Sequence, residues 1–143
     1  MSLWNAAAGV VMQYKIHPIL VNFTAALVPV SLAGDALGRW NGDDALTKTG
    51  AWTLFCAGAV TPLTALTGWL FWMSDDVGSR GMMIHKWLGT ALALLVPALA
   101  LWRARYYRRD RRLGALYLAA AALVVAALVY QGSLGGAQVF KDM

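Results

Sequence analysis

Four long stretches of this chain contain no Asp, Glu, Lys or Arg, and they cover residues 16–34, 49–74, 87–102 and 113–140. A helix needs about 20 apolar residues to cross the hydrocarbon core of a bilayer. Soluble domains carry about 25% charged residues, whereas this chain carries 13% and has a mean hydropathy of +0.56. The third stretch is short, but it reaches a full span if residues 82–85 begin its helix. The pattern therefore predicts an all-α integral membrane protein with four transmembrane helices.

We expect these helices at residues 16–40, 51–73, 83–105 and 113–134, within a four-helix transmembrane domain of residues 16–143. Residues 1–15 form a separate N-terminal segment that lies in the membrane interface or makes a short outer helix. Turn-forming residues at 41–44 and 74–79 join successive spans, and such short links favour an up-and-down bundle. The single cysteine, Cys56, excludes an intrachain disulfide, and we interpret it as a small core residue. Most tryptophans fall near the predicted span ends, where indole rings settle at the lipid–water boundary: Trp40, Trp52, Trp69, Trp72, Trp87 and Trp102.

The net charge of +5 is concentrated in six arginines between residues 103 and 112. A basic cluster beside a membrane span is mostly a topology signal, and contact with anionic lipid headgroups is a natural second role. We do not expect nucleic-acid binding, because no aromatic stacking platform accompanies the charge. Eight cations fall on the side of this cluster and four on the other, so the cluster should face the cytoplasm and both termini the outside.

The sequence also repeats itself at an interval of 68 residues. We interpret the repeat as two helical hairpins in parallel orientation, related by a pseudo-two-fold axis along the membrane normal. The alternative is coincidence, since apolar runs match easily. The two paired prolines should bend the first and third helices at similar depth. The matches are His17 with His85, Leu20 with Leu88, Ala25 with Ala93, Pro29 with Pro97 and Gly68 with Gly136.

The two histidines of the chain, His17 and His85, begin the first and third predicted spans, near the outer face. In an up-and-down bundle these spans occupy opposite corners, so both imidazoles could face one central object. Two imidazoles on facing helices can ligate a haem iron from both sides. The sequence therefore predicts one b-type haem (haem b) near the outer face, with His17 and His85 as metal ligands. The other candidate cofactor-binding residues are glycines that leave room for a macrocycle and cations that could meet its propionates: Gly68, Gly89, Gly132, Gly136, Arg80 and Lys86.

Two histidines alone are a weak metal signature, and other interpretations stay open. His17 precedes Pro18, a residue favoured at a helix start, so both histidines could simply be wet interfacial residues. The thioethers of Met82 and Met83 suit Cu(I), although adjacent methionines cannot share one helical face. A quinone could use Tyr130 and Gln131 in the outer layer.

Asp35 is an acidic residue inside the first predicted span. We favour a local ion pair with Arg39, four residues later. A proton relay is the weaker alternative, because the other spans offer no acid or histidine at that depth. No set of nucleophile, base and orienting residue appears, so the sequence does not support a hydrolase or a kinase.

The run His17-Pro-Ile-Leu-Val-Asn-Phe23 resembles the opening motif, roughly His-Pro-x-Leu-Val-His-Phe-Pro, of a bacterial family of small predicted membrane proteins of unknown function. The resemblance continues through Thr67-Gly68, the start of the His85 helix and the ending Gly132-Ser-Leu-Gly-Gly136. The chain departs from the motif at Asn22 and Thr24. The resemblance implies a four-helix fold in the bacterial inner membrane and carries no activity.

From these observations we expect a redox carrier or an accessory subunit more than a stand-alone enzyme. The leading hypothesis is electron transfer through one haem, in contact with a redox protein, a larger membrane complex or a quinone pool. A haem-free structural or assembly subunit of a respiratory or photosynthetic complex is the main alternative. A protein that handles copper or a small solute is the third.

Overall fold

The computed structural model of the protein describes residues 3–74, 80–108 and 113–139, and these residues form five helices. They are α1 (Leu3–Gln13), α2 (Ile16–Asn41), α3 (Asp44–Ser74), α4 (Arg80–Arg108) and α5 (Ala115–Val139). Four of the described helices, α2 to α5, are long and apolar enough to cross a membrane. The prediction of an all-α, four-span membrane protein is therefore confirmed, and the N-terminal segment contains one short helix, α1.

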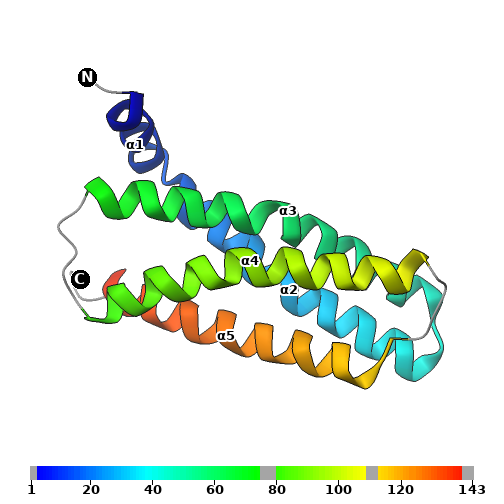
Figure 1. The fold of residues 1–143 in the computed structure, drawn as a ribbon. Coiled ribbons are helices and arrows are strands. Elements are labelled where there is room, and N and C mark those ends of the chain that lie inside the picture. Colours follow the sequence, from blue (N-terminus) through cyan, green and yellow to red (C-terminus); the bar gives the residue numbers. More distant parts are fainter. Residues whose placement is uncertain (1–2, 75–79, 109–112, 140–143) are drawn as a thin grey trace.

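The four long helices form an up-and-down bundle (Figure 1). Each packs against the next in the chain, and α5 packs back against α2, so α2 and α4 lie on one diagonal and α3 and α5 on the other. The α1 helix contacts α3 and α2 and projects from the end of the bundle where α2 and α4 begin. We call this end the histidine end, because His17 and His85 lie in the first turns of α2 and α4.

The link between α2 and α3 explains why α3 begins earlier than predicted. Gly42 adopts a left-handed conformation with φ of 68°, which glycine reaches without a Cβ penalty. The Asp43 carboxylate then accepts hydrogen bonds from the backbone N–H groups of Ala45 and Leu46 at 2.8 and 3.2 Å. This is the N-cap arrangement, so α3 begins at Asp44 and not at residue 51. The predicted link at 75–79 lies outside the described residues.

The core of the bundle is narrow and built from aliphatic, small and a few polar side chains. Leu54 and Ala57 of α3 are almost fully buried, so Cys56 between them points outward, and it is exposed. The prediction that Cys56 is a core residue was therefore wrong, because helical periodicity turns position 56 away from the buried stripe. Many large apolar side chains are likewise exposed around the bundle, as expected where the surrounding solvent is lipid.

Buried residues recur between the two halves of the chain, as the predicted repeat requires. The interval is the predicted 68 residues between α2 and α4, but it is 67 residues between α3 and α5. Pro29 and Pro97 lie at matching places inside α2 and α4. The buried pairs are Thr24 with Leu92, Val28 with Val96, Ser31 with Leu99 and Asp35 with Arg103, and then Leu54 with Ala121 and Ala57 with Val124. The bundle therefore consists of two related hairpins, α2–α3 and α4–α5. The second hairpin is one residue shorter than the first between equivalent positions of its two helices.

Candidate functional site

The imidazole of His17 lies between α2 and α3. Its Nδ1 is 3.1 Å from the backbone oxygen of Thr64 and 3.2 Å from the hydroxyl of Thr67. Phe71 stacks alongside at a centroid distance of 6.4 Å. The ring also lies directly on Gly68, where an added Cβ would be 2.8 Å from the imidazole Cε1. Glycine at 68 is therefore what lets the ring reach the backbone of α3.

His85 repeats this arrangement in the second hairpin. Its Nδ1 is 3.1 Å from the backbone oxygen of Gln131 on α5. A Cβ at Gly135 would come within 2.9 Å of the imidazole Cε1. The glycine equivalent to Gly68 is thus Gly135, one residue before the predicted match at Gly136, because α3 and α5 are related by 67 residues and not by 68.

These contacts set the chemistry of both rings. A backbone carbonyl can only accept a hydrogen bond, so each Nδ1 carries the proton and donates it. Each Nε2 then holds the lone pair, which is the tautomer that a metal-ligating histidine presents. Among the described contacts, the rings do not hydrogen-bond to each other, and each one contacts the helix that follows its own in the chain. The structure therefore brings two oriented imidazoles to one end of the bundle.

The side chain of Gln131 covers the free face of His85. Its amide nitrogen is 3.4 Å from His85 Nε2 and would lie 2.8 Å from a Cβ at Gly89. Gly89 therefore makes room for this amide. The Gln131 Oε1 atom is buried and has no hydrogen-bond partner among the described residues. A ligand at His85 Nε2 would have to displace this flexible side chain.

The remaining predicted glycines and cations divide into two groups. A Cβ at Gly132 or at Gly136 would meet nothing within 4 Å, so neither position is closely packed. Arg80 is exposed at the start of α4. Lys86 instead extends over indole rings, with its Nζ 3.2 Å from the centroid of Trp72 and 3.9 Å from that of Trp69. Only Lys86 of this group is held in place by contacts that the structure describes.

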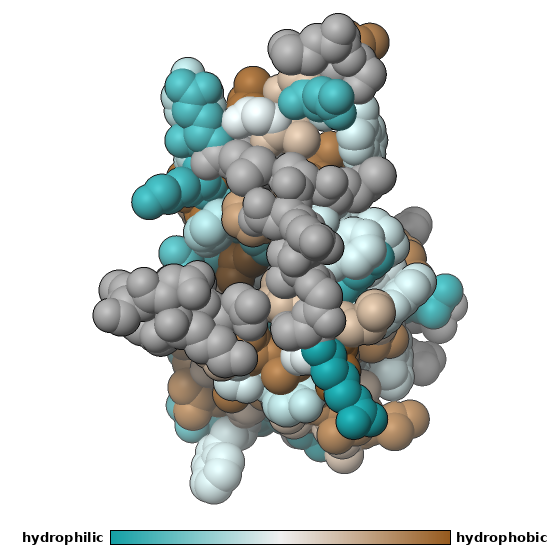
Figure 2. All heavy atoms as spheres, turned by 90° about the vertical axis from the view of Figure 1, so that its left-hand side faces the viewer, coloured by the Kyte–Doolittle hydropathy of each residue, from teal (hydrophilic) through white to brown (hydrophobic). Residues whose placement is uncertain are grey.

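The histidine end carries polar side chains around an otherwise apolar bundle. Figure 2 views the molecule from this end and shows hydrophilic side chains on several sides with hydrophobic ones between them. Trp69 and Trp87 meet edge to face at 5.8 Å, and Trp69 donates to the Thr90 hydroxyl at 3.0 Å. Indoles with one wet and one apolar side are typical of the membrane interface.

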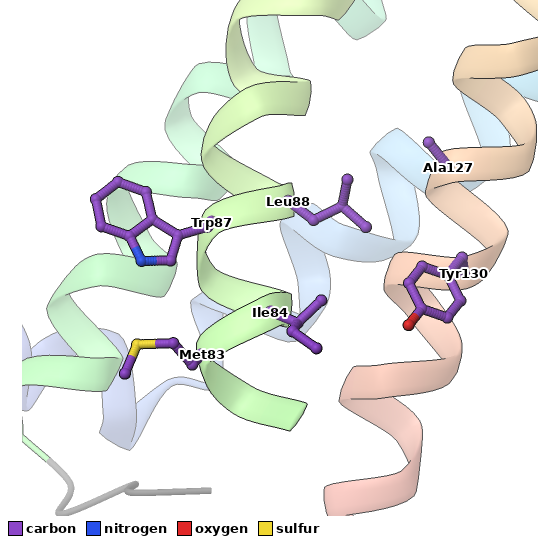
Figure 3. Close-up of a pocket in the computed structure, with 6 residues that line it drawn as sticks. All are labelled: Met83, Ile84, Trp87, Leu88, Ala127 and Tyr130. Carbon is purple, nitrogen blue, oxygen red and sulfur yellow. The ribbon is translucent and has the colours of Figure 1, made fainter. Parts of the chain in front are cut away.

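A shallow groove of about 490 Å³ runs between α4 and α5 near the histidine end. Figure 3 shows Leu88 and Ile84 of α4 pointing toward the helix that carries Ala127 and Tyr130, with Trp87 on the other side of α4. Met83 also lines the groove, whereas His85 contacts α5. Residues two apart on a helix do not share a face, so Met83 and His85 point in different directions from α4. Among the described residues, no group of three or more His, Cys, Asp and Glu is placed to hold a metal.

A buried ion pair at the opposite end of the bundle was not predicted. Asp35 is fully buried and accepts three hydrogen bonds of 2.9–3.1 Å from the guanidinium of Arg103. Tyr117 donates to the same carboxylate at 2.9 Å, and Arg103 also donates to the Thr47 carbonyl at 2.9 Å. The prediction that Asp35 pairs with Arg39 was wrong, because Asp35 points into the bundle and Arg39 is exposed. Arg103 therefore lies inside the bundle and not in the loop where the sequence placed it. In the sequence, only the 68-residue repeat, which aligns position 35 with position 103, indicated that the two residues pair.

Comparison with known proteins gives a family and no activity. No curated protein and no solved structure matches the chain. The profile of one family, described as "Predicted membrane protein (DUF2231)", matches residues 13–143. This span contains the whole bundle and both histidines, and it fits the four membrane-spanning helices described above. The chain therefore belongs to the DUF2231 family of predicted membrane proteins.

Proposed function

We propose that this protein is a membrane-embedded electron-transfer subunit that holds one b-type haem through His17 and His85. The observation that carries the proposal is the matched pair of Nδ1 hydrogen bonds to backbone carbonyls, at 3.1 Å in each hairpin. They fix both rings in the tautomer whose Nε2 is a ligand. Structural histidines at a wet helix end have no need for this shared orientation.

Bound haem would supply reversible one-electron chemistry at its iron. The surrounding residues suit such a cofactor in two ways. Gly68 and Gly135 let each imidazole lie against the neighbouring helix. Lys86 and Arg80 lie at the same end of α4 and offer positive charge to propionates. One haem at the end of a core about 30 Å thick cannot carry electrons across it, so the subunit works with partners.

Among such partners we propose a lipid-soluble quinol. The groove between α4 and α5 opens toward lipid and is lined by apolar and aromatic side chains. The Gln131 Oε1 atom next to His85 is a buried acceptor without a donor among the described residues, and a quinol hydroxyl would satisfy it only by reaching past the residues that line the groove. A larger redox complex or an outer redox protein remains the other expected partner.

The test is spectroscopic. The protein is expressed with ample haem supply, purified in detergent, and its haem-to-protein ratio and reduced visible spectrum are recorded. We expect one haem per chain with the sharp bands of bis-imidazole ligation. His17→Gln and His85→Gln should each lose those bands, whereas the control Lys15→Gln, an exposed residue beside α2, should keep them. A colourless wild-type preparation, or colour that survives both histidine substitutions, contradicts the proposal.

Two observations favour a second function, that of a haem-free structural or assembly subunit. The Gln131 amide already covers His85 Nε2, and the bundle exposes large apolar side chains on many sides. The variant Gln131→Ala separates the two functions. Removal of the amide should raise haem occupancy if His85 is a ligand, and it should change nothing in a scaffold that never binds haem.

A further inference from the structure

The buried ion pair occupies equivalent positions of the two hairpins. Asp35 and Arg103 are 68 residues apart, the same interval that relates His17 to His85 and Val28 to Val96. They come from the diagonal helices α2 and α4, and both are almost completely buried, at 0% and 1% exposure. The pair therefore lies where a two-fold axis relating the hairpins would pass, and there each residue meets its own counterpart.

The surroundings of the pair differ between the hairpins in a complementary way. The first hairpin provides Gly50, where a Cβ would be 2.5 Å from Asp35 Oδ1. The second provides Tyr117, which is related to Gly50 by the 67-residue interval and donates to Asp35 Oδ2. The Asp35 carboxylate thus occupies the space at Gly50 of its own hairpin, and the other hairpin supplies the cation and the hydroxyl that bind this carboxylate.

This arrangement distinguishes the correct partner from an incorrect one. Two copies of the first hairpin, paired about the same axis, would bring two Asp35 carboxylates together with no cation. Two copies of the second would bring two Arg103 guanidinium groups together. A buried charge without a partner is strongly unfavourable, and like charges at an interface exclude the wrong partner. Only a first hairpin with a second hairpin gives a neutral core.

We infer that Asp35 and Arg103 form a selectivity pair that makes the hairpin α2–α3 assemble with α4–α5 and not with a second copy of itself. The two hairpins bury residues at equivalent positions, although the first buries Thr24 and Ser31 where the second buries Leu92 and Leu99. The ion pair adds a charge requirement to this packing. Without this pair, the first hairpin of one chain could pair with the first hairpin of another, and the second with the second, which would join two chains. The inference concerns assembly and does not depend on any cofactor.

The test separates selectivity from stability. Replacing a buried ion pair by uncharged residues of similar size often preserves stability, so the full-length double variant Asp35→Asn/Arg103→Met should still fold. Two copies of it with different tags are co-expressed, one tag is captured from detergent extract, and the other is quantified. We expect several-fold more co-capture than between two wild-type copies, which set the background from other surfaces.

A matched control removes the same two kinds of charge from exposed positions of neighbouring helices, as Asp44→Asn/Arg105→Met. It should stay at the wild-type background. The single variant Asp35→Asn should give less co-capture than the double variant, since Arg103 still opposes pairing of second hairpins. Co-capture of the double variant at the control level overturns the inference. So does a double variant that no longer folds, because the charges would then serve stability and not selectivity.

Discussion

At the scale of single residues, the two imidazoles owe their orientation to glycines on the facing helix. An added Cβ at Gly68 or Gly135 would lie 2.8 or 2.9 Å from an imidazole carbon, closer than packed carbon atoms approach. The rings therefore rest on bare backbone, and this lets Nδ1 reach the carbonyl one turn earlier. The same contact explains why the second hairpin uses Gly135 and not its neighbour.

Gly135→Ala and Gly136→Ala form a matched pair that tests this contact. The first methyl group would collide with the His85 ring, and overpacking of this kind costs about 1–3 kcal/mol. The second meets nothing within 4 Å and removes the helix penalty of glycine, about 1 kcal/mol. Thermal unfolding in detergent should therefore show a lower Tm for Gly135→Ala and an unchanged or higher Tm for Gly136→Ala. Equal shifts would mean that the ring does not lie against Gly135.

The histidines were predicted from the sequence and the Asp35 partner was not, for a physical reason. The chain contains two histidines, and each lies at the start of a predicted span. For Asp35, a nearby arginine at i+4 offered a local explanation, whereas the true partner is 68 residues away. Local spacing predicts pairs on one helix face, but it does not tell which face points inward. The repeat held that information, since it aligns position 35 with position 103.

At the scale of helices, the sequence predicted the number and type of elements well and their ends less well. Charge-free stretches report the part of each helix inside hydrocarbon, but a helix continues through charged residues at the interface. The α4 helix therefore extends from Arg80 to Arg108 and not from 83 to 105. Similarly, α3 begins at its Asp43 cap. The outward position of Cys56 was missed because apolar composition on all sides of a membrane helix obscures its buried stripe.

The close crossing of α2 and α3 gives a prediction at this scale. A Cβ at Gly34 would be 3.0 Å from the Gly50 nitrogen and from the Leu46 carbonyl oxygen. These are backbone atoms, so they cannot move aside unless the helices separate. Such small-residue contacts hold membrane helices together. Gly34→Val should lower stability by about 1–3 kcal/mol or more, measured by thermal unfolding in detergent.

Gly132→Val is the control for the crossing, since it places the same side chain in mid-helix where nothing lies within 4 Å. It should unfold within a few degrees of the wild type. If Gly34→Val proved equally harmless, α2 and α3 would have to lie further apart than described.

At the scale of the whole molecule, the buried ion pair changes the balance of charge that sets orientation. Of the eight cations assigned to the end opposite the histidines, Arg103 is neutralised inside the bundle. The remaining seven still exceed the four of the histidine end, and the side with more Lys and Arg stays in the cytoplasm. The histidine end should therefore face outward, as should the first residues of α1.

Labelling of single cysteines tests this orientation in a Cys56→Ala background, which removes the exposed native thiol. Leu3→Cys lies at the exposed start of α1, and Asn41→Cys lies at the exposed end of α2. A membrane-impermeant maleimide should label Leu3→Cys in intact bacterial cells whose outer barrier is opened, and Asn41→Cys only after lysis. The opposite pattern would place His17 and His85 on the cytoplasmic side. The proposed haem ligation would be unaffected by that reversal, but the proposed partner would then be a cytoplasmic redox protein, because electron transfer requires that the donor reach the end of the bundle where we propose the haem.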